Sequence, residues 1–342
     1  MTDDNQLIKE KYAQEDMFLY DVSALSVAKD IIQQMEHPFY SLSKKPETGI
    51  RKYEHNGNSL EITPSVNGLP TIYDKDIIVF CVSQIAADMR AGMETSQWVK
   101  IPALTFLQFT NRGKSKKDYE AMEDAIKRLR GVTITTNIKT GKKVTHHSFG
   151  LIEEGGFKRL DNDRSGRLEG VEVKISEWLF NAIKANEVLT LHREYFRLRR
   201  PVEKRLYEIF RKHCGKQQSW VVSLEILHKK LGSKMPLRRF RFEIKKLEDT
   251  NHLPGYDIKY DRGRDLITVF NREYVEDDPI DSLDDRPTLQ PETFESAKSI
   301  LENHTPKQAE QLWLEYWINS GKEKITNPDK AFLGFCKSLA SA

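Results

Sequence analysis

The clearest hydrophobic pattern in the chain lies between Pro236 and Thr250, in the segment PLRRFRFEIKKLEDT. Apolar residues recur there at steps of three, four and three, a period that predicts a helix with one buried stripe. The stripe consists of Leu237, Phe240, Ile244 and Leu247. The rest of this helix is rich in basic residues, which are candidates for contacts with a partner: Arg238, Arg239, Arg241, Lys245 and Lys246.

A second helix with the same spacing is predicted earlier in the chain, between Ser115 and Gly131. Its apolar stripe consists of Tyr119, Met122, Ile126 and Leu129. Acidic residues share its outer face, so we expect weaker base contacts here, or contacts with a second protomer. Its basic candidates, with those just before it, are Lys114, Lys116, Lys117, Lys127 and Arg128.

Each of these helices is followed by two β-like runs around a glycine turn. The first pair is VTITTNI and VTHHSFGLI, and the second is YDIKY and LITVF. β-Branched and aromatic residues beside a glycine are typical of hairpins. Basic residues at the predicted tips are further candidates: Lys139, Lys142 and Lys143 in the first hairpin, and Arg262 and Arg264 in the second.

A helix, a strand and a short helix are predicted before each basic helix. In the second copy they begin at Pro201, with Ser223 as the N-cap of the short helix and Gly232 as its stop. This order is typical of a winged helix. The third helix of such a fold enters the major groove, where arginine reads base edges and lysine meets phosphate. Arg238, Arg241 and Lys245 would share that face, and the hairpin tips would reach phosphates or a minor groove.

The predicted fold class is α+β, with tandem winged-helix (helix-turn-helix) domains and a small all-α C-terminal domain. We expect a partly disordered arm over 1–36, the two winged-helix domains over 37–190 and 191–274, an acidic linker over 275–292 and a helical domain over 293–342. Acidic clusters in the glycine-rich stretch 153–163 are read as solvated turns. The C-terminal aromatics either build a bundle core or, where exposed, dock a partner: the candidates are Trp313 and Trp317.

Charge along the chain favours a polyanion as the partner. The net charge of the 342 residues is only +3, but residues 111–150 hold ten Lys and Arg against four Asp and Glu, and 191–270 are also strongly basic. No apolar run is long enough for a membrane span and the polar start lacks the pattern of a signal peptide, so we expect a cytoplasmic protein. Three distant cysteines indicate neither a disulfide framework nor a zinc site.

Catalytic patterns are not found in the sequence. RGKSKK at 112–117 lacks the first glycine of a phosphate-binding loop, and no His-apolar-His triplet of the kind that holds a metal beside a nicking tyrosine occurs. His146 and His147 would point to opposite sides of a strand. We therefore expect no enzymatic activity, no cofactor and no metal.

Three phrases in the chain are more specific than a generic winged helix: HPFYSLSKKP, PTIYDKDIIVFCVSQI and PALTFLQFT. They resemble the plasmid replication initiator protein A family of bacteria, and the resemblance runs from about His37 to Arg272. It implies a RepA-type initiator that binds repeated sites, called iterons, in the double-stranded DNA of a plasmid origin. It also implies opening of adjacent AT-rich DNA, recruitment of the host replicative helicase or its loader, and self-association as a dimer that restrains copy number.

Other functions remain open at the level of sequence. A transcriptional regulator or partition protein could carry the same tandem modules, and its sites would lie elsewhere than in an origin. An interaction scaffold whose basic faces meet acidic protein would bind DNA without sequence preference. An enzyme that cuts or joins DNA is the least favoured alternative.

Overall fold

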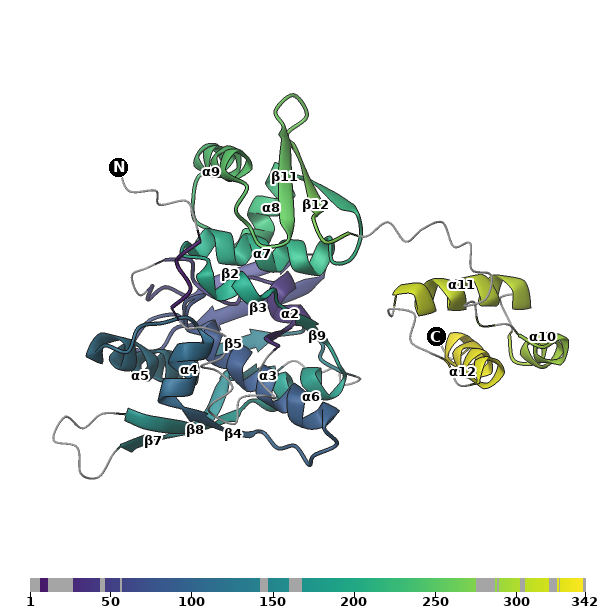
Figure 1. Cartoon of the computed structure of the whole chain (residues 1–342), viewed down its shortest axis with the longest axis horizontal. Coiled ribbons are helices and arrows are strands. Elements are labelled where there is room, and N and C mark those ends of the chain that lie inside the picture. Colours follow the sequence, from purple (N-terminus) through teal and green to yellow (C-terminus); the bar gives the residue numbers. More distant parts are fainter. Residues whose placement is uncertain are drawn as a thin grey trace. The chain divides into compact units, whose positions relative to one another are not determined.

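A computed structural model of the chain describes residues 7–11, 27–43, 47–55, 57–141, 147–159, 168–274, 287, 289–301, 305–319, 325 and 327–340 (Figure 1). The fold is a mixed α+β fold. The chain divides into two compact units: unit 1, Met1–Tyr274, and unit 2, Val275–Ala342.

The second copy of the predicted order of helix, strand, two helices and hairpin is called the second repeat, and the earlier copy the first repeat. The second repeat forms three helices and a three-stranded antiparallel sheet in unit 1. The side chain of Ser223 accepts a hydrogen bond from the Ile226 N–H, and Gly232 ends the short helix with a φ of 66°, a conformation that favours glycine. The strands lie in the order β10-β12-β11. The elements are α7 (Pro201–His213), β10 (Ser219–Ser223), α8 (Leu224–Leu231), α9 (Leu237–Thr250), β11 (Tyr256–Asp261) and β12 (Leu266–Asn271).

The first repeat has the same order of helices and strands. Its sheet order is β4-β8-β7, so the last strand of the repeat pairs with the first, as β12 pairs with β10. The helix α5 begins with a capping box between Ser115 and Asp118. The elements are α3 (Lys75–Arg90), β4 (Trp98–Pro102), α4 (Ala103–Phe109), α5 (Lys116–Gly131), β7 (Ile152–Arg159) and β8 (Leu168–Ile175).

The hairpin that the sequence assigns to the first repeat is the wrong one. β5 (Thr133–Thr136) and β6 (His147–Phe149) do pair, but they belong to a separate sheet of order β2-β3-β5-β6, with β2 (Arg51–His55) and β3 (Asn58–Thr63). Buried Ile134 of β5 lies opposite buried Ile62 of β3, and this shared apolar face explains the choice of sheet. The hairpin equivalent to β11–β12 is β7–β8, which includes part of the stretch read as turns.

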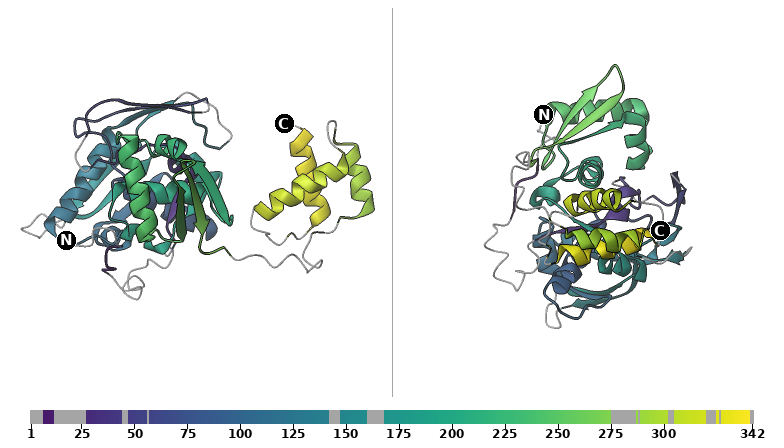
Figure 2. Two further views of the ribbon diagram at one scale, coloured as in Figure 1. Left: turned by 90° about the horizontal axis from the view of Figure 1, so that it is seen from above. Right: turned by 90° about the vertical axis from the view of Figure 1, so that its right-hand side faces the viewer.

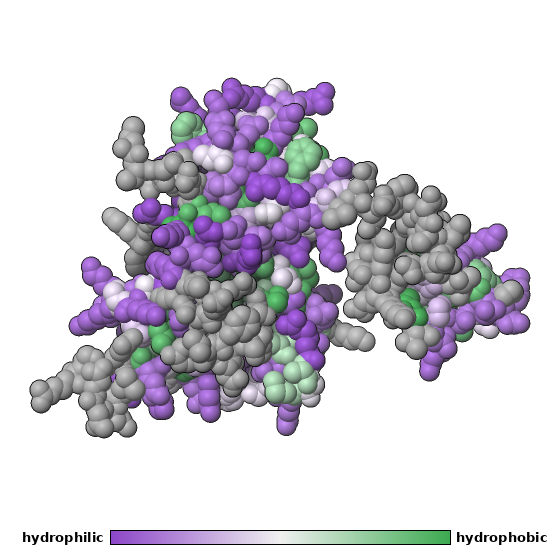
Figure 3. Space-filling view, in the orientation of Figure 1, coloured by the Kyte–Doolittle hydropathy of each residue, from purple (hydrophilic) through white to green (hydrophobic). Residues whose placement is uncertain are grey.

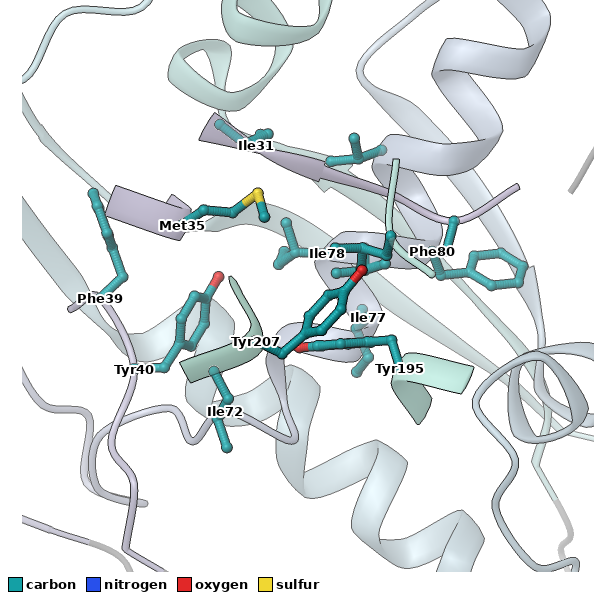
Figure 4. Close-up of a cluster of buried hydrophobic side chains, with 14 of the residues drawn as sticks. Ile31, Met35, Phe39, Tyr40, Ile72, Ile77, Ile78, Phe80, Tyr195 and Tyr207 are labelled. Carbon is teal, nitrogen blue, oxygen red and sulfur yellow. The ribbon is translucent and has the colours of Figure 1, made fainter. Parts of the chain in front are cut away.

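Two short elements lie in the described part of the arm expected over 1–36. β1 (Lys29–Ile31) pairs with β9 (Val188–Thr190), and α2 (Ile32–Glu36) follows it directly. Ile31 and Met35 are fully buried and lie among side chains from both repeats, including Ile78 of α3 and Tyr207 of α7 (Figure 4). One hydrophobic core therefore runs through both predicted winged-helix domains. Between the repeats lie α6 (Glu177–Lys184) and the 3-10 helix η2 (Arg193–Arg197).

A buried ionic cluster joins the N-terminal segment to both repeats. The Lys75 Nζ of α3 lies 2.6 Å from Asp30 Oδ2 and 2.9 Å from Glu208 Oε2 of α7, and all three side chains are fully buried. Tyr195 donates to the other Glu208 oxygen at 2.7 Å. Because each charge has a partner inside the core, the cluster fixes α7 relative to α3.

Two further contacts of α7 and the N-terminal segment hold the helix pair α8–α9. Arg205 of α7 donates to the carbonyl oxygens of Met35 and Lys230, at 2.9 and 3.0 Å, and so satisfies acceptors at the C-terminal ends of α2 and α8. Gly232 lies against Pro38, where a side chain would meet the ring at 2.2 Å. The second repeat is thus positioned by residues distant in sequence.

The described part of unit 2 is a small cluster of three helices. Trp313 and Phe332 pack with ring centroids 5.5 Å apart, and Asp329 Oδ1 accepts a hydrogen bond from the Thr293 hydroxyl at 2.6 Å. The helices are α10 (Pro291–Lys298), α11 (Pro306–Asn319) and α12 (Pro328–Ala340), close to the three that the sequence predicts.

Candidate nucleic-acid interface

The helix α9 is anchored by the stripe that its sequence predicts. Phe240 and Ile244 are fully buried and Leu247 nearly so, while Leu237 packs partly against the core. The α9 helix and the β11–β12 hairpin lie side by side at one end of unit 1, whereas the β7–β8 hairpin lies at the other (Figures 1 and 2). The surface over α9 and its hairpin is mostly hydrophilic (Figure 3).

The outward face of α9 is basic with one aromatic residue in it. Phe242 is 64% exposed. The residues three and four positions away on either side of it are all cations. Among the residues that the structure describes, none of these four cations forms an ion pair, so their charge is available to a partner. They are Arg238, Arg239, Lys245 and Lys246.

Arg241 lies on the same side of the helix as Arg238 and Lys245, but unlike them it is paired within the protein, and its expected base contact stays a prediction. Its guanidinium donates to both carboxylate oxygens of Asp265, at 3.1 and 2.6 Å, and to the Tyr260 hydroxyl at 3.0 Å. The hydrogen bonds that Arg241 donates to Asp265 raise the pKa of Arg241. Arg241 therefore braces α9 against the hairpin.

The tip of the β11–β12 hairpin presents two exposed cations. Arg262 and Arg264 are exposed, and the Asp261 carboxylate accepts hydrogen bonds from the Gly263 and Arg264 N–H groups, at 2.9 and 3.2 Å. These bonds form the turn that carries both arginines. The hairpin and α9 thus offer two adjacent basic surfaces.

The helix α5 of the first repeat carries less free positive charge than its sequence suggests. Arg128 makes a bidentate ion pair with Asp74, at 2.7 and 2.9 Å, and is largely buried. This fastens α5 to the start of α3 and engages the Arg128 guanidinium within the protein, while its expected DNA contact stays a prediction. Lys127 lies 3.2 Å from Asp124 Oδ1, and Lys116 lies 3.8 Å from Glu120 Oε1.

The other basic candidates of the first repeat are only partly described. Lys114, Lys117 and Lys139 are exposed. Lys142 and Lys143 lie outside the described residues, as does the tip of the β7–β8 hairpin. Lys139 lies in the connection between β5 and β6 of the four-stranded sheet, and not in the hairpin that matches β11–β12.

Trp313 of unit 2 is buried, with 3% of its surface exposed. It packs the bundle and offers no surface to a partner. The side chain of Trp317 lies outside the described residues.

The described residues hold no group of three or more His, Cys, Asp and Glu side chains suited to a metal ion. Cys81, Cys214 and Cys336 are buried free thiols. Burial raises the pKa of Cys214 to about 11, which leaves a thiol and not a thiolate at neutral pH. No helix in the described part of the chain is both long and apolar enough to cross a membrane.

The fold and the basic helix define an α+β protein with a repeated helix-and-hairpin architecture and one strongly basic helix. The chain belongs to the replication initiator protein A family, whose sequence model matches residues 29–258. Membership makes it a replication initiator and implies DNA as a partner.

One relative agrees with this assignment in sequence. A "Putative replication protein" of Wigglesworthia glossinidia brevipalpis is 35% identical over 262 residues, which cover 75% of this chain and 94% of that protein. The crystal structure of domains 2 and 3 of RctB has a similar fold, with a TM-score of 0.52 at 12% identity, over 70% of this chain and 98% of the other. A second RctB structure of the same domains has a TM-score of 0.47 at 14% identity, over 70% of this chain and 95% of the other.

Proposed function

We propose that the protein is a plasmid initiator that binds repeated origin sites, or iterons, through two winged-helix modules. The observation that carries this proposal is the unpaired basic face of α9 beside an arginine-tipped hairpin. The sheets β4-β8-β7 and β10-β12-β11 have equivalent strand orders, with the last strand of each repeat in the middle, which supports two modules of one kind. The second module would make most of the base contacts, because three of the five cations on α5, Lys116, Lys127 and Arg128, lie within ion-pair distance of a carboxylate.

Further steps of initiation are part of the same proposal. Binding would promote opening of adjacent DNA, with no enzymatic step by the chain itself, and would recruit the host replicative helicase or its loader in the cytoplasm. Unit 2 would supply that contact, through Trp317 and not through buried Trp313. Self-association as a dimer would limit initiation.

The test is selection of binding sites from a random duplex library with the full chain. The winning site is then titrated at about 50 and 200 mM salt. We expect one preferred site and an affinity that falls on the order of 10³-fold or more over this range, because six or more phosphate contacts release counterions. Direct repeats of that site beside AT-rich DNA in a replicon would support initiation, and a lone palindrome over a promoter would support repression instead.

The variant Arg238→Ala with Lys245→Ala tests the α9 face directly. Loss of one bidentate base contact costs about 1–3 kcal/mol and relaxes the preference at one position, and loss of one phosphate contact lowers the salt slope by about one. Lys184→Ala is the matched control, because Lys184 is an exposed cation at the end of α6. Equal effects of the two variants, or binding without any sequence preference, would contradict the proposal.

A further inference from the structure

Phe242 is the most exposed aromatic side chain on α9, and it lies opposite the buried side of the helix. At 100° per residue it is about 200° from Phe240, whereas Ile244 and Leu247 lie close to Phe240. The side chain is 64% exposed. An exposed aromatic ring lacks the stabilisation that burial normally gives such side chains, so this position indicates contact with a partner.

The neighbours of Phe242 indicate what that partner is. Arg238 and Lys245 flank it along one side of the helix, and Arg239 and Lys246 flank it along the other. An apolar protein pocket would have to desolvate these cations without compensation. A surface with negative charge on both sides and an apolar group between them fits the arrangement.

Double-stranded DNA provides such a surface in its major groove. The groove admits one α-helix between two phosphate backbones, and the apolar group on its floor is the C5-methyl group of thymine. The two rows of cations on α9 match the two backbones, and the ring between them faces the floor. Phenylalanine is one of the side chains that make this apolar contact.

The rotation of α9 about its axis is fixed by an ion pair on each flank. Arg241 is held by Asp265 of the hairpin on one side, and Glu243 is paired with Arg200, which precedes α7, on the other. Neither ion pair involves the outward face. Phe242 is therefore held pointing away from the protein.

We propose that Phe242 contacts the C5-methyl group of one thymine in the major groove and sets a thymine preference at that position of the site. This inference rests on the proposed function, since it requires that α9 binds duplex DNA. It adds a specificity-determining residue that carries no charge.

The experiment compares the full-length wild type with Phe242→Ala, Phe242→Leu and Phe270→Ala. Each thymine of the selected site is replaced singly by deoxyuridine, which removes only the methyl group. We expect one replacement to lower wild-type affinity about fourfold, the equilibrium factor for one buried methyl group. Phe242→Ala should lose that sensitivity and Phe242→Leu should keep part of it. Phe270→Ala, which removes a 39% exposed aromatic residue from β12, should keep all of it.

Each other outcome overturns the inference. If the wild type is insensitive to deoxyuridine at every position, or if Phe242→Ala retains the wild-type sensitivity, Phe242 does not read thymine. If Phe242→Ala loses affinity only for single-stranded DNA, the ring stacks on bases instead. If the wild type selects no site at all, the proposed function fails as well, and this result is distinct from selection of a site that Phe242 does not influence. Thermal unfolding confirms that each variant is folded, as expected for exposed positions.

Discussion

Replacing Lys75 by methionine should destabilise unit 1 strongly, because Lys75 is the shared cation of the buried cluster. Its Nζ contacts both Asp30 and Glu208 in the core. Glu208 would keep Arg205 at 3.2 Å and the Tyr195 hydroxyl at 2.7 Å. Among the described residues, Asp30 would keep only the Ile31 N–H, at 2.9 Å. The cost therefore falls on Asp30.

Removing one partner of a buried pair typically costs about 3–5 kcal/mol, since the other charge stays buried without compensation. We expect a loss of that size in the free energy of unfolding at pH 8, measured by urea denaturation followed by circular dichroism. The double variant Lys75→Met with Asp30→Asn should recover about half of the loss. Lys52→Met is the control. Lys52 pairs with Glu61 at 2.9 Å, the distance between Lys75 and Glu208, but this pair lies on the surface, so its loss should change the free energy of unfolding little.

The pH dependence gives a second check on the same variant. Burial raises the pKa of Asp30 to about 6 even though Lys75 opposes the shift, and loss of Lys75 should raise it further. A carboxyl group whose folded pKa exceeds its unfolded pKa stabilises the protein at low pH, and this contribution is lost as pH rises through the folded pKa. The deficit of Lys75→Met should therefore be smaller at pH 5 than at pH 8. A loss below about 1 kcal/mol, or a larger deficit at pH 5, would refute the reasoning.

Three more predictions follow from individual side chains. Arg128→Ala should lower the free energy of unfolding by about 2 kcal/mol, because the bidentate pair with Asp74 is lost. It should leave the salt slope of DNA binding unchanged, and a lower slope would identify Arg128 as a phosphate contact. Burial lowers the pKa of His37 to about 4, so the unfolded state binds the extra proton and stability falls as pH decreases from about 6.5 to 4. Between pH 7 and 4.5 the free energy of unfolding, measured by urea titration, should fall on the order of 2–3 kcal/mol less in His37→Asn than in the wild type. Equal decreases in the two proteins would contradict the assignment of this pH dependence to His37. Arg262→Ala with Arg264→Ala should weaken binding to all duplexes alike and lower the salt slope by about two, whereas an effect confined to one sequence would indicate base readout.

The helices of both repeats and the hairpin of the second could be predicted from the sequence because their signals are local. The stripe of Phe240, Ile244 and Leu247 follows the helical period, and the cap at Ser223 and the stop at Gly232 lie within a few residues of the bonds they make. The family resemblance came from contiguous phrases in the same way, and the family match confirms it.

The choice of hairpin in the first repeat could not be predicted in this way. β5 (TITT) alternates polar and apolar side chains, whereas β7 (IEEGGFKR) has two adjacent glycines and no such alternation, so the sequence pattern favours the wrong hairpin. Strand pairing depends on which distant strand presents a matching apolar face, and Ile134 lies opposite Ile62 of a segment that precedes the whole repeat. The pattern of residues 133–149 does not specify β3 as the partner strand.

Charge along the chain determined that this protein carries two basic regions, and the helical period determined which residues anchor α9. Only the tertiary structure decided which cations are free. Arg128 and Arg241 are as basic in the sequence as Arg238, but Asp74 and Asp265 come within hydrogen-bond distance of the first two through folding. An ion pair depends on distance in space, and residues far apart in the chain acquire that distance only when the helices and hairpins pack together.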